Sequence, residues 1–130
     1  MARARIDETA GRDAVLAVLA SGEHPDCTPP DRTPPARTVT ALAVRYLLQA
    51  LAEASPGRSV EVRVPPFGAV QAVEGPKHTR GTPPNVVELD PATFVAIATG
   101  GLDWASAVAA GRVHASGARS DLSALFPLAY

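Results

Sequence analysis

The residues best suited to chemistry lie in one short loop between two predicted strands. Lys77, His78 and Arg80 place three potential cations within four residues, next to threonines at 79 and 82 and glycines at 75 and 81. Such side chains hold carboxylates or phosphates through charge-assisted hydrogen bonds. Arg63, on the outward side of the preceding strand, is expected to join them. The loop therefore predicts an anion site, with an ordinary solvated turn as the alternative.

The remaining reactive side chains match no catalytic or metal-binding motif. Cys27 and the histidines at 24, 78 and 114 do not have the spacing of a zinc site. The sequence contains no phosphate-binding loop, dinucleotide-binding glycine motif or serine nucleophile motif. We therefore expect no metal, no cofactor and no enzymatic activity.

Three aspartates are better explained as helix caps than as paired catalytic carboxylates. Asp90, Asp103 and Asp121 each precede a segment with helical character. A carboxylate at this position accepts hydrogen bonds from the free N–H groups of the first turn. Their types and positions thus predict where helices begin.

Composition and net charge argue against a nucleic-acid-binding, membrane or secreted protein. The chain has 130 residues, a formal net charge of −1 and one cysteine, and 46% of its residues are hydrophobic. The charge gives no basic excess for a phosphate backbone, so we expect no nucleic-acid partner. No window resembles a membrane span or a secretion signal. We expect a single cytoplasmic domain over residues 1–130, and the oligomeric state stays open.

The first half of the chain predicts two helices separated by an irregular loop. Apolar residues recur at helical spacing over residues 6–19, where Gly11 weakens the pattern and Gly22 follows as a stop. Residues 24–37 form a Pro-rich internal loop. Thr38 is then expected to cap the second helix, whose apolar side includes Leu42, Tyr46 and Leu47. Arg45, Gln49 and Glu53 fall on the opposite side of that helix.

The second half predicts strands on both sides of a helix pair. Residues 60–64 alternate between valine and charged residues, and Pro65-Pro66 turns the chain into a second strand within residues 67–75. A third strand covers residues 85–89. Two short helices follow, each ended by glycine, before a last strand and an amphipathic C-terminal turn. This order predicts an α+β fold with a mainly antiparallel sheet covered on one face by helices.

The C-terminal half resembles a known family of carrier domains. The segment LDPATFVAIATGGLDWASAVAAGRVHASGARSDLSALFPL has an aspartate cap at Asp90, an aromatic at Phe94 and a helix stop at Gly100. It continues with a second glycine stop and a strand ending in Ser-Gly, as in sterol carrier protein type-two domains. RVPPFGAVQ and HTRGTPPNVVELDP are similar to short bacterial orthologues of that family. The resemblance covers residues 38–128.

This resemblance implies a hydrophobic tunnel between sheet and helices and a non-enzymatic carrier of lipids, fatty acyl chains or similar molecules. Core packing is the alternative role for Trp104 and the phenylalanines. The expected ligand-binding residues are Leu42, Tyr46, Leu47, Arg63, Phe67, Lys77, His78, Arg80, Phe94, Trp104 and Phe126.

Two other functions remain open at this point. One is a small enzyme or enzyme-accessory subunit that uses the loop with Lys77, His78 and Arg80. The other is a protein-interaction module that docks its partner through the apolar residues Leu122, Leu125, Phe126 and Leu128.

Overall fold

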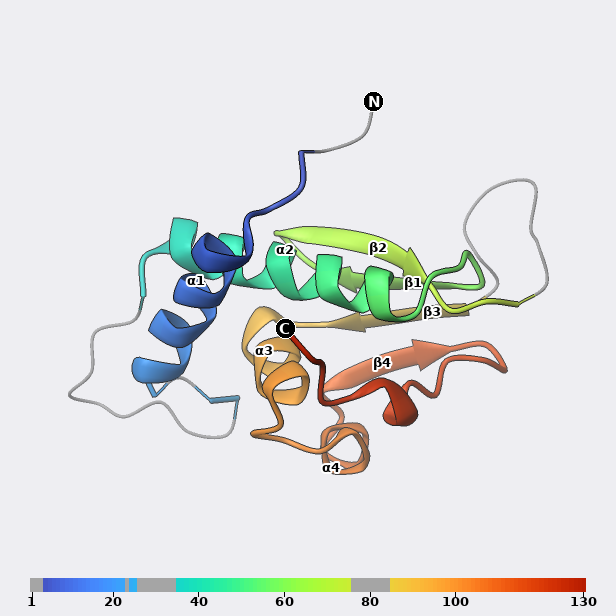
Figure 1. Cartoon of the computed structure of the whole chain (residues 1–130). Coiled ribbons are helices and arrows are strands. Elements are labelled where there is room, and N and C mark those ends of the chain that lie inside the picture. Colours follow the sequence, from blue (N-terminus) through green and yellow to red (C-terminus); the bar gives the residue numbers. More distant parts are fainter. Residues whose placement is uncertain (1–3, 23, 26–34, 76–84) are drawn as a thin grey trace.

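The computed structural model describes residues 4–22, 24–25, 35–75 and 85–130 (Figure 1). Its elements follow the order predicted from the sequence. They are α1 (Glu8–Ala20), α2 (Arg37–Ala54), β1 (Val60–Val64), β2 (Gly68–Ala72), β3 (Asn85–Leu89), α3 (Pro91–Thr99), α4 (Trp104–Ala109), β4 (Val113–Ser116) and a final 3₁₀ turn, η1 (Ser123–Leu125).

The four strands form one mixed sheet in the order β2-β1-β3-β4. β1 pairs antiparallel with β2, and β3 pairs antiparallel with β4, whereas β1 and β3 are parallel. β2 ends at Ala72 beside Val60, and β3 starts at Asn85 beside the same residue. The chain therefore re-enters the sheet from the end where β1 began, which makes β3 parallel to β1. Two of the three pairings are antiparallel, so the predicted α+β class is confirmed.

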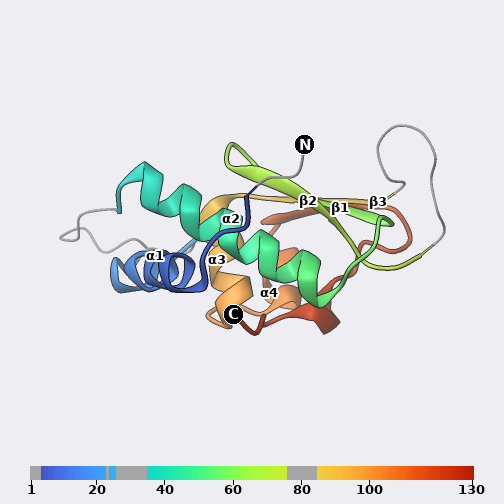
Figure 2. The same ribbon diagram turned by 45° about the horizontal axis from the view of Figure 1, so that its top comes forward.

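The helices cover one face of this sheet (Figure 2). Val60, Val62 and Val64 alternate with Glu61 and Arg63 in β1, and only the valines are fully buried. Because successive side chains of a strand point to opposite faces, the valines face the helices. The polar residues belong to the uncovered face.

A single hydrophobic cluster joins the helices to the sheet. Leu47 and Leu51 of α2 and Phe94 of α3 are completely buried, and the same cluster includes Val15 of α1 and Leu122 near the C-terminus. Removing a side chain of this size from water contributes roughly 1.5–3 kcal/mol. The helix-covered face is thus stabilised mainly by aliphatic packing.

The predicted caps of α3 and α4 are confirmed. Asp90 accepts a hydrogen bond from the Thr93 N–H at 3.2 Å, and Asp103 accepts one from the Ser106 N–H at 3.3 Å. Gly100 ends α3 in the left-handed conformation, with φ of 87°, which glycine adopts at no steric cost.

The cap predicted for α2 is wrong. The helix begins at Arg37 and its N-cap is Ala36, which provides no side-chain hydrogen bond. Thr38 lies inside the first turn, two positions after the N-cap. The Pro-rich loop predicted over residues 24–37 therefore ends before Arg37, and its residues 26–34 lie outside the described part of the chain.

The predicted C-terminal turn is present as the 3₁₀ turn η1. Asp121 accepts from the Ser123 N–H at 3.0 Å and so stabilises the start of this turn. The N-cap of η1 is Leu122, which makes no capping hydrogen bond through its side chain. Asp121, the predicted cap, therefore lies one position before the observed N-cap.

Gly11 has a packing role that the helix pattern did not indicate. It is buried in α1, and a Cβ atom added there would lie 2.2 Å from ring atoms of Tyr46. Such a distance is far below van der Waals contact. Glycine at this position thus lets α1 approach α2 over the Tyr46 ring.

Among the described helices, none combines the length and apolar character needed to cross a bilayer.

Candidate functional site

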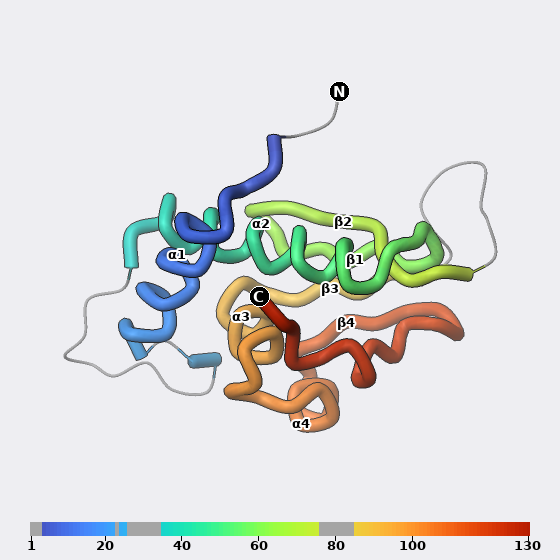
Figure 3. Tube along the Cα trace, viewed as in Figure 1, coloured from blue at the N-terminus to red at the C-terminus, as the bar shows by residue number. Residues whose placement is uncertain are grey.

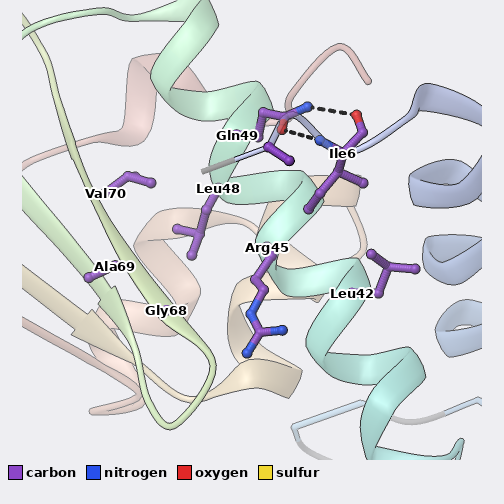
Figure 4. A pocket seen from close by; sticks show the side chains of 9 residues that line it. Ile6, Leu42, Arg45, Leu48, Gln49, Gly68, Ala69 and Val70 are labelled. Atoms are coloured by element: carbon purple, nitrogen blue, oxygen red, sulfur yellow. Dashed lines mark hydrogen bonds between the residues drawn. The ribbon is translucent and has the colours of Figure 1, made fainter. Parts of the chain in front are cut away.

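A cleft of about 600 Å³ opens between α2 and the edge strand β2 (Figure 4). α2 contributes one wall and β2 contributes the second through residues 68–70. The third wall comes from the N-terminal segment before α1. The lining residues are Ala4, Ile6, Leu42, Arg45, Leu48, Gln49, Gly68, Ala69 and Val70.

The cleft walls are largely apolar. Leu42 and Leu48 come from α2, Val70 comes from β2 and Ile6 comes from the N-terminal segment. Gly68 lets β2 come close to the helix, because a Cβ there would lie 3.3 Å from Leu48 Cδ1.

Arg45 is the cationic side chain among the described lining residues of the cleft. The Arg45 Nε donates a hydrogen bond to the Phe67 carbonyl at 2.9 Å. Figure 4 shows the guanidinium group extending from α2 into the space beside residues 68–70. Within the described part of the chain, no acidic side chain pairs with Arg45. The Nε hydrogen bond therefore orients the guanidinium group of this lining residue.

A second guanidinium group lies at the same end of the cleft. Arg37 lies over the Phe67 ring, with its Cζ 5.3 Å from the ring centroid. Phe67 thus contacts Arg45 through its carbonyl and Arg37 through its ring. This arrangement makes the Phe67 end of the cleft electropositive.

Hydrogen bonds to Gln49 hold the N-terminal wall in place. The Gln49 Oε1 accepts from the Ile6 N–H at 2.9 Å, and Nε2 donates to the Ile6 carbonyl at 3.1 Å. An exposed ion pair between Arg5 and Glu53 flanks this contact. The polar side predicted for α2 is therefore partly covered by a segment more than 40 residues away in the sequence.

The structure brings together only some of the predicted site residues. Leu42 lines the cleft and Phe67 lies at its electropositive end. Tyr46, Leu47 and Phe94 are buried in the core, at 4%, 0% and 0% exposure. Their binding of a ligand stays a prediction.

The other aromatic candidates pack against each other. The Trp104 and Phe126 rings stack with centroids 5.9 Å apart and an interplanar angle of 9°. Trp104 is 8% exposed, while Phe126 is partly buried. This pair packs α4 against the C-terminal segment, away from the cleft lining.

The predicted anion loop falls outside the described residues, which end at 75 and resume at 85. Lys77, His78 and Arg80 therefore stay a prediction. Arg63 points to the uncovered face of the sheet, where it pairs with Glu61 at 2.6 Å. It does not lie in the cleft.

The uncovered face carries a shallow polar hollow of about 430 Å³. Strand register places Arg63, Glu88 and His114 next to one another across β1, β3 and β4. Within the described ranges, no three histidine, cysteine or acidic side chains are grouped as a metal site requires. This hollow has no apolar surface comparable to that of the cleft.

Arg45, Leu48, Gln49 and Val70 are cleft residues that the sequence pattern did not single out. The i, i+4 spacing of Arg45, Gln49 and Glu53 indicated a polar helix face, which is usually solvated. Nothing local in the sequence indicates that Ile6 packs beside this face.

Comparison with known protein families identifies the family of this chain. The profile of a family described as bacterial SCP ortholog matches residues 36–128, well over half of the chain. No curated protein matches the sequence. The matched region includes α2, the sheet and the C-terminal segment, whereas α1 and the N-terminal wall of the cleft lie before it.

Proposed function

Because the chain belongs to the family of bacterial orthologues of sterol carrier protein, SCP, we propose that it binds an amphiphilic small molecule in the cleft between α2 and β2. The ligand's apolar part contacts Leu42, Leu48 and Val70. Its polar group meets Arg45 at the end marked by Phe67. The protein acts by binding and carrying this ligand rather than by converting it.

The observation that supports this proposal most strongly is the pairing of apolar walls with one oriented cation. Small-molecule sites are typically lined by apolar side chains with a few placed polar groups, and they measure about 300–1,000 Å³. The cleft, at about 600 Å³, lies within that range. Arg45 and Gln49 are the polar side chains of its described lining. A guanidinium and an amide can orient a ligand, which suits a carrier.

The electropositive end favours a ligand with an anionic group. Arg45 and Arg37 both contact Phe67, and neither is neutralised by an acidic side chain within the described residues. Guanidinium groups bind carboxylates and phosphates through paired hydrogen bonds. A fatty acid carries a carboxylate at one end of a long apolar chain and therefore matches both halves of the cleft.

Calorimetric titration of delipidated protein with oleate and with oleyl alcohol tests this proposal. Both probes have the same apolar chain, and only oleate is anionic. We expect Arg45→Gln to weaken oleate binding about five- to tenfold, as loss of a partly exposed ion pair does, and to leave oleyl alcohol binding unchanged.

Arg58→Gln is the matched control, because Arg58 contacts Gln71 outside the cleft. It should leave the affinity for oleate unchanged. Absence of binding by either probe would contradict the carrier function. Equal losses for oleate and oleyl alcohol in Arg45→Gln would contradict the assigned role of Arg45.

A further inference from the structure

The N-terminal segment, whose path before α1 is drawn in Figure 3, contributes residues to two hollows of different character. Ala4 and Ile6 line the apolar cleft, whereas Arg5, between them in the sequence, lines a neighbouring hollow of about 390 Å³. Alternate residues thus face opposite sides, as in an extended strand. We call residues 4–6 the strap. The second hollow, here the polar recess, is lined by Arg5, Glu8, Arg12, Tyr46, Gln49, Ala50, Glu53, Ala54, Ala129 and Tyr130.

Gln49 is the residue that the two hollows share. It lines both of them, and its amide forms both hydrogen bonds to the Ile6 backbone. The Arg5–Glu53 pair adds little, because its side chains are 62% and 47% exposed and such pairs are weak in water. The strap is thus held by the Ile6 side chain, which packs against the hydrophobic core, and by the two hydrogen bonds between Gln49 and Ile6, which we call the latch.

The strap is the most weakly attached wall of the cleft. Leu48 of α2 is buried in the core, and β2 is hydrogen-bonded to β1 along its length. The strap ends at Asp7, whose side chain caps α1 by accepting from the Ala10 N–H at 3.1 Å. This cap gives the strap a fixed pivot. Movement of residues 4–6 about that pivot needs no change in the sheet or in α2.

We propose that the strap is a displaceable partition and that Gln49 decides which ligands the site accepts. With the latch closed, the apolar cleft stands alone and holds a short amphiphile. With the latch open, the cleft and the polar recess join into one longer site, in which Ala50, Ala54 and Tyr130 offer apolar surface to the tail of a longer molecule. This inference rests on the proposed function for its ligand, while the movement of the strap can be measured without one.

Amide hydrogen exchange in ligand-free protein tests the latch itself. In Gln49→Ala, we expect the Ile6 amide to exchange about tenfold faster or more, because two hydrogen bonds of ordinary strength are lost. Gln71→Ala removes the same side chain from the uncovered face of the sheet, where Gln71 contacts Arg58. It should leave exchange at Ile6 as in the unmodified protein.

Titration with a short and a long fatty acid tests the effect on ligand choice. Oleate must open the latch, so Gln49→Ala should bind it about tenfold more tightly, since the same two hydrogen bonds no longer oppose entry. Decanoate fits the closed cleft, which Gln49 lines and whose strap wall Gln49 holds in place, so Gln49→Ala should bind it more weakly. The ratio of the two affinities is compared between Gln49→Ala and Gln71→Ala.

Slow exchange at Ile6 in Gln49→Ala would overturn the latch. An equal loss of affinity for both fatty acids would also overturn the proposal, because the strap would then be a fixed wall. If neither fatty acid binds any variant, the proposed function fails, and exchange at Ile6 alone decides whether the strap opens.

Discussion

At the scale of single residues, the Gly11–Tyr46 contact shows how one missing side chain positions two helices. Gly11 weakens α1 as a helix, since glycine costs up to about 1 kcal/mol relative to alanine. Glycine is nevertheless required here, because any larger residue would overlap the Tyr46 ring. Tyr46 in turn lines the polar recess. The contact thus connects helix packing with the surroundings of the proposed site.

Gly11→Ala should therefore destabilise the protein, against the usual preference of helices for alanine. The added methyl group overlaps the Tyr46 ring, and overpacking of this kind costs about 1–3 kcal/mol. Chemical denaturation followed by circular dichroism measures the change in the free energy of unfolding.

Gly101→Ala is the matched control, because its added Cβ would meet only the Ala96 carbonyl oxygen at an ordinary 3.6 Å. It should leave the stability nearly unchanged. A Gly11→Ala protein as stable as the control would show that α1 can shift away from Tyr46.

At the scale of elements, the first residues of α3 and α4 were predictable from sequence, because an aspartate caps each helix. The first residue of α2 was not. Asp90 and Asp103 stand next to apolar helical patterns, so their local chemistry identifies the start of α3 and α4. α2 starts at Arg37 without a side-chain cap, while Arg37 also contacts the Phe67 ring. That contact comes from the turn between β1 and β2, which no local pattern near residue 37 reveals.

The cap of α4 should make stability depend on acid pH. Hydrogen bonds from the Ser106 hydroxyl and N–H lower the pKa of Asp103 below 3.8. A lowered folded-state pKa favours the folded protein above the unfolded pKa, and this contribution is lost as the pH falls through the folded value. Asp103→Asn should therefore lower the melting temperature at neutral pH, and the difference from the unmodified protein should shrink toward strongly acidic pH.

Thermal melts at several pH values measure this effect, and Asp13→Asn is a control on the exposed side of α1. The control should show a smaller difference at neutral pH. A difference for Asp103→Asn that stays constant into strong acid would mean that the carboxylate charge does not stabilise α4.

At the scale of the whole molecule, the fold was predictable while the cleft was not. Alternating valines, caps and glycine stops are local signals, and together they predicted the α+β class and the order of elements. The cleft depends on three segments far apart in the sequence, around Ile6, Arg45 and Val70. The same apolar pattern fills a core or lines a site, so the sequence does not show that Leu48 lines the cleft whereas Phe94 and Trp104 lie outside its lining.

The architecture also separates two surfaces with different roles. The helix-covered side of the sheet carries the core and, at its β2 edge, the cleft. The uncovered side carries Arg63, Glu88 and His114 in register across three strands. The carrier function proposed here uses the first surface. Leu122 and Leu128 pack into the same core, which favours a structural role for these C-terminal residues over docking of a partner.

Backbone NMR of delipidated protein titrated with oleate tests most directly whether an amphiphile binds between α2 and β2. We predict that the largest chemical-shift changes fall on Ile6, Leu42 and residues 68–70, and that they saturate with ligand. Arg45→Gln should weaken the response at the same residues. Shifts confined to residues around Phe94 and Trp104, or no saturable shifts at all, would contradict the proposed site.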